Sequence, residues 1–484
     1  MKSINMIRSE AVCYARTDLP SIMPNLESLG LCSSNEVNTP MLPTKLLYLK
    51  HLTIMFASGE SFSPSYDYLS LVSFLDAAPS LETLILDVRN FSLIPPCTDI
   101  YVSGHCIGPT SSISFFIFSW LQVAVTLTVE EFTVVLCNMF KKKYKFPCSV
   151  LSNGNGSSIR HLELGLCAFR PTAELGPLRN LTGLILRSVH VTGDELLCFL
   201  SNSLALEKLD LSSCNEIICL KIPHVLQKFR CLRLLGCERL REIESKAPNL
   251  SSLRFDGNVK LSLGETLLQM KRLSILRQKV VYYARAELPC IMPNLETLDI
   301  RSNIEVVNTP LLPTKFFYLK HLSISITSGG SFSPSYDYVS LVSFLDGSPS
   351  LETLILNVSQ QIMEHKSVFG DSLGLRQMPE QRHYYMRSVK MTGFSSTKSL
   401  VELTCYIVKN AVSLECLVLD TLYGFRCSGE DSRITRCDSM SKSVLKEATR
   451  AVTAIRVYIE DIIPNTVKLT ILEPCTRCHA VGRR

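Results

Sequence analysis

A short apolar phrase recurs along the chain, with leucine or a similar residue at its first, fourth and sixth positions. It reads Leu-Glu-Ser-Leu-Gly-Leu from Leu26, Leu-Glu-Thr-Leu-Ile-Leu from Leu81 and from Leu351, and Leu-Glu-Cys-Leu-Val-Leu from Leu414. Further copies begin at Leu49, Leu181, Leu206, Leu250, Met270, Leu295 and Leu319, and weaker ones at Ile159 and Phe229. Because apolar and polar positions alternate at the end of the phrase, each copy predicts one short, half-buried strand.

The spacing of the phrase identifies the architecture. Between Ile159 and Leu319 its starts advance by 20 to 25 residues, which is the period of leucine-rich repeats. One such unit cannot bury its own apolar edge, so the units must stack. The predicted fold class is therefore α/β: a leucine-rich-repeat solenoid, or horseshoe, with a parallel concave sheet and helical or irregular convex returns.

Helical spacing of apolar residues appears between several of the predicted strands. It predicts helical returns over 70–76, 194–201 and 400–410. In the tail, apolar residues from Val444 to Ile459 follow the same spacing, Pro464 stops the helix, and 467–472 form a last strand. This predicts a C-terminal helix-strand cap over 426–484, which also contains several cysteines.

A longer similarity overlies the short repeat. Residues 38–88 match residues 308–358 at 39 of 51 positions, which indicates an internal duplication. The sequence predicts a partial leucine-rich-repeat copy over 1–88, an atypical apolar insertion or joint over 89–157, and the main array over 158–425. The apolar run 113–129 is shorter than the roughly 20 residues that a membrane span needs, so a buried insertion is favoured and a membrane-anchored repeat protein is the alternative.

Composition and charge narrow the classes of function. Lys plus Arg number 50 and Asp plus Glu 44, and because these charges are scattered, no nucleic-acid partner is expected. The N-terminal residues contain no apolar core of a secretion signal, and the 19 cysteines are spread through apolar segments. We therefore expect a cytoplasmic or nuclear protein whose thiols are mostly buried and reduced.

The chain contains none of the common catalytic motifs. Phosphate-binding loops, dinucleotide-binding glycines, metalloprotease helices and nucleophile elbows are all missing from the sequence. The nine histidines do not gather with carboxylates at metal or triad spacing. We expect no enzyme, no catalytic residue and no cofactor.

The polar positions that alternate with the inward leucines form a row on the concave face. Charges of both signs are mixed along it, which suits a protein partner better than a polyanion. The candidate partner-binding residues are His161, Glu163, Arg187, Lys208, Asp210, Arg233, Arg254, Asp256, Arg272, Thr297, Asp299, Arg301, His321 and Ser323.

The tail contains Cys475-Thr-Arg-Cys-His479, which matches the sequence motif of a covalent haem attachment site. Haem attachment needs export to an oxidising compartment, and a redox dithiol would stand at the start of a βαβ unit, so neither is favoured. Two alternatives stay open: reduced, uncoordinated thiols, or structural zinc held by Cys427, Cys437, Cys475 and Cys478, with His479 able to replace one of them.

The repeats and tail together resemble the plant F-box/leucine-rich-repeat proteins that end in an FBD-like segment. The resemblance rests on the repeat phrases, on residues 406–419, which are similar to the FBD pattern, and on the closing Glu-Pro-Cys-Thr-Arg-Cys-His. It implies a non-catalytic interaction scaffold related to substrate-recognition subunits of cullin ubiquitin ligases. Since no F-box phrase precedes the first repeat, we do not expect a Skp1-type adaptor among its partners.

Overall fold

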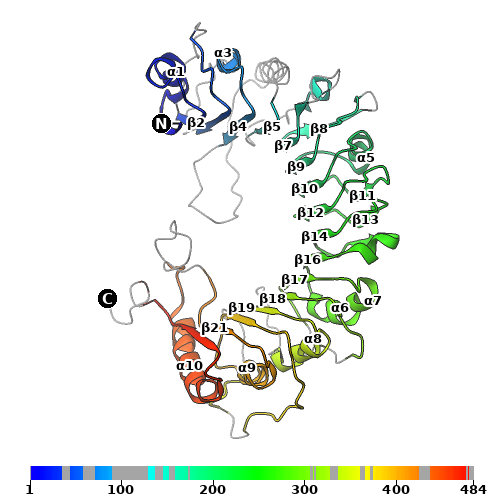
Figure 1. Cartoon of the computed structure of the whole chain (residues 1–484), viewed down its shortest axis with the longest axis vertical. Helices are drawn as coiled ribbons and strands as arrows, with labels where there is room; N and C mark the ends of the chain where they lie inside the picture. The colour runs from blue at the N-terminus through cyan, green and yellow to red at the C-terminus, as the bar shows by residue number, and fades with distance from the viewer. Residues whose placement is uncertain are drawn as a thin grey trace. The chain divides into compact units, whose positions relative to one another are not determined.

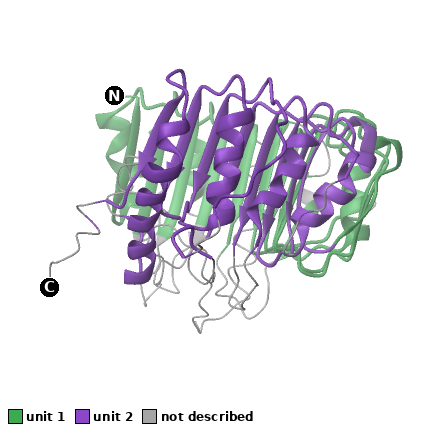
Figure 2. Ribbon diagram, turned by 90° about the horizontal axis from the view of Figure 1, so that it is seen from below, with its two compact units in different colours: residues 1–250, 259–266 green, residues 251–258, 267–484 purple. Residues whose placement is uncertain are grey.

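We describe the chain from a computed structural model, whose succession of strands and returns is shown in Figure 1. The described residues are 2–34, 44–57, 71–89, 129–136, 145–151, 158–172, 175–305, 309, 312–327, 336–359, 366–370, 374–424, 437–475 and 478. The chain divides into two compact units, drawn in two colours in Figure 2. Unit 1 comprises residues 1–250 and 259–266, and unit 2 comprises 251–258 and 267–484.

Unit 1 is built on a parallel sheet whose strands follow one another in chain order. They are β1 (Ser3–Ser9), β2 (Ser28–Ser34), β3 (His51–Ala57), β4 (Thr83–Arg89), β5 (Glu131–Val135), β7 (His161–Gly165), β9 (Gly183–Arg187), β10 (Lys208–Ser212) and β12 (Cys231–Leu235). Leu29, Leu52 and Leu84 lie in register on neighbouring strands and are buried. Each buried leucine contributes about 2 kcal/mol to folding. The leucines of successive strands pack together and form the core.

The returns of unit 1 are short helices and small secondary sheets. The helices are α1 (Ala11–Thr17), α2 (Leu19–Ile22), α3 (Val72–Ala77) and α5 (Gly193–Ser201), and the 3-10 segments are η2 (Cys148–Leu151) and the start of η4 (Gly264–Gln269). Strands β11 (Cys219–Ile222), β13 (Glu242–Ser245) and β15 (Lys260–Ser262) pair in parallel, as do β6 (Lys145–Phe146) and β8 (Ala168–Phe169). A capping box between Thr192 and Glu195 begins α5, which confirms the helix predicted there.

Unit 2 repeats the design of unit 1. Its parallel strands are β14 (Ser252–Asp256), β16 (Arg272–Leu276), β17 (Thr297–Ser302), β18 (His321–Ile326), β19 (Thr353–Val358), β20 (Ser388–Thr392), β21 (Cys416–Asp420) and β22 (Lys468–Leu472). Its returns hold α6 (Val280–Ala286), α7 (Leu288–Ile291), η5 (Tyr338–Leu341), α8 (Val342–Asp346), α9 (Lys398–Asn410), α10 (Lys442–Tyr458) and η6 (Glu460–Ile462). The predicted parallel repeat fold is thus confirmed in each unit.

Helix α9 departs from the expected one-sided burial. The sequence pattern gives it one apolar side, yet every residue from Leu400 to Val408 is buried, Glu402 included. The cause is that α9 packs against both η5 and α10. Arg376 neutralises the buried Glu402 by donating from its backbone nitrogen at 2.8 Å and from Nε at 2.7 Å.

The region predicted as an insertion, 89–157, contains a repeat strand. Strand β5 pairs with β4 on one side and β7 on the other. Its phrase, Val129-Glu-Glu-Phe-Thr-Val134, has apolar residues at the first, fourth and sixth positions but no leucine, so the leucine pattern did not predict it. Phe132 and Val134 take the inward positions and are buried.

Candidate functional site

The alternate positions of the strands form what we call the open face of each sheet, the face away from the buried leucines. In unit 1, Glu163, Asp210 and Arg233 share one row across β7, β10 and β12, with Ile185 between them on β9. His161 and Lys208 share the neighbouring row, and Arg187 lies on a third. All of the predicted residues of unit 1 are exposed or half-buried.

The predicted residues of unit 2 lie on its open face in the same way. Arg254, Asp299 and Ser323 share a row, Arg272, Thr297 and His321 share the next, and Asp256 and Arg301 share the third. All of them are exposed or half-buried. The structure therefore places the predicted residues in continuous rows within each unit, while their contact with a partner stays a prediction.

Three arginines of the open face, Arg187, Arg233 and Arg301, are paired with carboxylates that lie nearby on the same face. Arg187 Nε lies 2.6 Å from Glu163 Oε1, and Arg233 Nε lies 3.7 Å from Asp210 Oδ2. In unit 2, Asp299 Oδ2 accepts from Ser274 Oγ at 3.0 Å and from the Arg301 guanidinium at 3.3 Å. Because these positive charges are already neutralised, a polyanion would gain little from them.

Two glycines of unit 1 make room for side chains on the open face. A Cβ at Gly183 would lie 2.5 Å from His161 Nδ1, and one at Gly30 would touch the Asn5 amide oxygen. Each polar side chain thus lies over the bare backbone of the next strand. Any larger residue at these glycines would have to push the neighbouring side chain away.

A second set of charged residues, which we call the edge pairs, was not predicted from the sequence. They occupy the position directly after the first residue of a phrase and just before its strand, where in several consecutive phrases lysine or arginine alternates with glutamate. The pairs are Lys2–Glu27 at 2.8 Å, Lys50–Glu82 at 2.7 Å, Arg160–Glu130 at 3.3 Å, Lys271–Glu296 at 3.0 Å, Lys320–Glu352 at 3.9 Å and Arg387–Glu415 at 3.8 Å. The alternation of Leu-Glu and Leu-Lys in the sequence is the signal that could have revealed them.

The edge pairs shift the ionisation of their members. A hydrogen bond from Lys50 lowers the pKa of Glu82, and hydrogen bonds from Lys2 and Lys271 do the same for Glu27 and Glu296. Since the pairs are solvent-exposed, their effect on stability is small.

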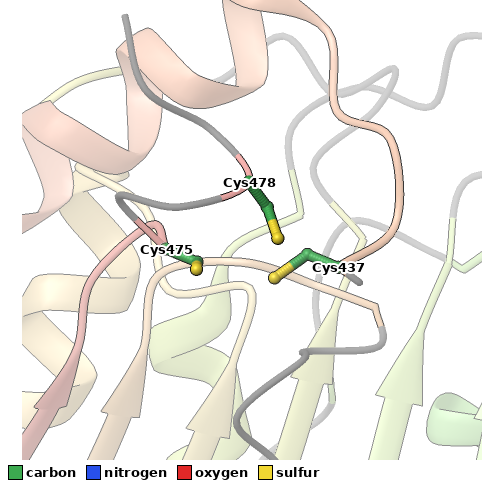
Figure 3. Close-up of side chains that lie close together, drawn as sticks. All are labelled: Cys437, Cys475 and Cys478. Atoms are coloured by element: carbon green, nitrogen blue, oxygen red, sulfur yellow. The ribbon is translucent and has the colours of Figure 1, made fainter. Parts of the chain in front are cut away.

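Two groups of cysteines differ in their surroundings. Burial raises the pKa of Cys167 and Cys214 to about 12 and that of Cys405 to about 11, so these thiols stay protonated and unreactive at neutral pH. Cys437, Cys475 and Cys478, by contrast, are half-buried and lie together (Figure 3). The other two candidate ligands of the tail, Cys427 and His479, lie outside the described residues.

Comparison with known proteins decides the family. The sequence matches the leucine-rich-repeat domain family described as At1g61320/AtMIF1, LRR domain, over residues 1–95 and 104–476. The chain belongs to this family. Membership of the At1g61320/AtMIF1 repeat family agrees with the repeat fold found in both units and with the predicted likeness to plant repeat proteins.

Other comparisons add less to the At1g61320/AtMIF1 assignment. No curated protein matches the chain. Among solved structures, the crystal structure of a TLR13–ssRNA13 complex matches with a TM-score of 0.29 and 12% sequence identity, over 87% of this chain and 71% of the other. Among the described helices, none combines the length and apolar character needed to cross a membrane, and residues 113–128 of the apolar run lie outside the described part.

Proposed function

We propose that the chain is a non-catalytic scaffold that binds a protein partner on the open face of its repeat sheets. The observation that carries this proposal is the pairing of the open-face charges. Arginines alternate with carboxylates and with apolar positions such as Ile185 and Ile355, a mixture typical of protein interfaces. A surface made for nucleic acid would instead present unpaired cations in a continuous stripe.

The test is charge reversal on the open face. Lys208 of β10 and Arg272 of β16 are both exposed, so Lys208→Glu and Arg272→Glu change the surface without leaving a buried charge unpaired. A matched control pair, Lys228→Glu and Arg239→Glu, carries the same change of charge on exposed connections between strands. Each variant serves as bait in a plant extract, and bound proteins are identified by mass spectrometry.

We expect a specific set of proteins that the open-face variant loses and the control variant retains. An affinity loss of at least about tenfold per reversed contact is typical when a charge faces its complement. Equal binding by both variants would place the interface elsewhere. Binding of nucleic acid that disappears only with the open-face variant would also contradict the proposal.

The relation to ubiquitin ligases is a narrower proposal within the same function. The resemblance of residues 406–419 to the FBD pattern supports a receptor-like role, in which the repeats hold a protein substrate. Since the sequence shows no F-box phrase, we expect the purified chain not to bind a Skp1-type adaptor in a direct binding assay. Measurable binding of that adaptor would reveal a docking site of another kind and make the chain a ligase subunit.

A further inference from the structure

Three cysteine side chains of unit 2 converge beyond the end of its last strand. The Sγ atoms of Cys437, Cys475 and Cys478 all lie within 4.8 Å of one another, and Figure 3 shows the sulfurs turned toward one another. In a tetrahedral site with Zn–S bonds of about 2.3 Å, neighbouring sulfurs are about 3.8 Å apart. A side-chain adjustment of about 1 Å would therefore bring the three sulfurs onto one metal ion.

The convergence is a result of the fold. Cys475 and Cys478 are close in the chain, so their proximity alone carries little information. Cys437 precedes α10, however, and the other two cysteines follow β22, so a helix and a strand separate the two parts of the cluster. Strand β22 pairs with β21, and α10 packs against Leu422 directly after β21, so the fold of unit 2 brings the third sulfur to the pair.

Ordered elements hold both sides of the cluster. On the strand side, the Thr421 backbone nitrogen and hydroxyl donate to the Leu472 carbonyl at 3.0 and 2.9 Å, just before the cysteine pair. Arg456 of α10 also bonds Glu473 at 3.1 Å. On the helix side, the Ser441 hydroxyl accepts from the Val444 amide and fixes the start of α10.

A small apolar cluster completes this support. Val444 and Ala448 of α10 pack with Leu422, which follows β21, and Met440 and Leu445 lie against them. The described backbone that follows Cys437 and the backbone that precedes Cys475 are thus positioned before any ion binds. A site prepared in this way loses little conformational entropy on binding.

We propose that Cys437, Cys475 and Cys478 bind a structural zinc ion that fastens the tail to the start of α10. Thiolate sulfur selects Zn²⁺ over calcium or magnesium, and the Cys-x-x-Cys spacing of the tail pair is common in structural zinc sites. Each thiol releases its proton to solvent as its sulfur binds the ion. The proposal goes beyond partner binding, because the site acts on the capping end and not on the open face.

The first experiment measures metal in the full-length protein. Purified from cells grown with zinc, the chain should hold about one zinc per molecule. The Cys437→Ser variant and the double variant Cys475→Ser with Cys478→Ser should lose it. Cys290→Ser is the matched control, since Cys290 is an exposed cysteine on α7, and this variant should keep the ion. Zinc retained by all variants, or by none including the unmodified chain, would overturn the proposal.

A second experiment covers variants that fail to fold. Cobalt(II) replaces zinc in the unmodified chain, and three coordinating thiolates give a strong sulfur-to-cobalt charge-transfer band together with tetrahedral ligand-field bands. The absence of these bands would overturn the proposal. A tail disulfide is the rival outcome: the peptides containing Cys437, Cys475 or Cys478 would be linked in a non-reducing digest, and recovery of such a link from freshly purified protein would also overturn it.

The fourth ligand is identified with two more variants. Sequence offers Cys427 and His479, so Cys427→Ser and His479→Ala are compared by zinc affinity. Loss of about tenfold or more in one variant names the fourth ligand, whereas no loss in either means that solvent completes a three-thiolate site.

Discussion

The described parts of residues 2–89 and 271–358 fold alike within their own units, yet their open faces differ. On the first two strands of each segment, the residues at matching positions are Ser3, Asn5, Ser28 and Gly30 in the first, and Arg272, Ser274, Thr297 and Asp299 in the second. The first set is uncharged and the second carries two charges. Solvent imposes no shape on this face, so the two segments are free to differ there.

The interiors of the two segments show the opposite behaviour. Arg16 and Arg285 are both buried, and each donates from Nε to the backbone carbonyl of a serine, Ser73 at 3.0 Å and Ser343 at 2.9 Å. Each also donates to a threonine hydroxyl of its own segment. A buried guanidinium needs fixed acceptors, so it restricts the surrounding backbone. The two segments therefore share the buried residues that packing constrains, and they differ at the exposed residues of the open face.

The largest expected effect comes from breaking this shared interior. Arg16→Met and Arg285→Met each remove the guanidinium hydrogen bonds to a serine carbonyl and a threonine hydroxyl. Each should lower the free energy of unfolding of its own unit by about 3 kcal/mol. Urea denaturation combined with hydrogen exchange would measure and locate the loss. The control, Arg239→Met on an exposed connection, should stay within about 0.5 kcal/mol of the unmodified chain. Equal, small losses of stability in all three variants would mean that the buried guanidinium does not stabilise either segment.

The next effect concerns the open face. Ser274→Asn with Asp299→Gly gives the second segment the residues of the first at two neighbouring positions. We expect stability to change by less than about 1 kcal/mol, since the exchanged bonds are half-exposed, and binding of the partner to weaken by about tenfold. The measurement is the affinity of the double variant and of the unmodified chain for the partner that the bait experiment recovers. Unchanged affinity would show that the difference between the two faces has no role in binding.

A smaller difference separates the cation–π contacts of the two segments. The Arg8 guanidinium carbon lies 4.6 Å from the centre of the Tyr14 ring, and that of Arg277 lies 3.7 Å from the Tyr283 ring. We expect Arg277→Met to cost about 1 kcal/mol and Arg8→Met about half as much. Thermal unfolding of the two variants in parallel measures these losses. A larger loss of stability in Arg8→Met than in Arg277→Met would show that the shorter distance does not mark the stronger contact.

The smallest effect is at the edge pairs. Lys50 and Glu82 are 2.7 Å apart in the first segment, whereas Lys320 and Glu352 are 3.9 Å apart in the second. The hydrogen bond from Lys50 lowers the pKa of Glu82, so its stabilisation is present above the unfolded-state pKa and is lost as pH falls through the folded-state value. Lys50→Met should return the pKa of Glu82 toward its ordinary value. Carboxylate NMR titration tests this, and an unmoved pKa would rule out Lys50 as its cause.

Much of the fold was predictable because its signals are local. The period of the phrase and the alternation within it gave the strands, and the spacing from Val444 to Ile459 gave α10 together with the strand after Pro464. Strand β5 was not predicted because valine and phenylalanine replace leucine in its phrase. The nearly complete burial of α9 was not predicted, because it depends on packing against η5 and α10, which are distant in the sequence.

The candidate sites divide in the same way. The open-face rows could be read from the sequence, because in a strand alternate side chains point to one face. The pairing of Glu163 with Arg187 depends on the register between strands more than 20 residues apart, which the bonded geometry of a single strand does not fix.

The sequence by itself determined the repeat architecture, the inward leucines and the type of residue on the open face. Local periodicity carries that information, since each unit must bury its own apolar positions against the next. The tertiary structure alone decided which distant residues meet: Cys437 with the pair at Cys475 and Cys478, and Arg16 with Ser73. Such contacts depend on how the returns pack, and no short stretch of sequence records that packing.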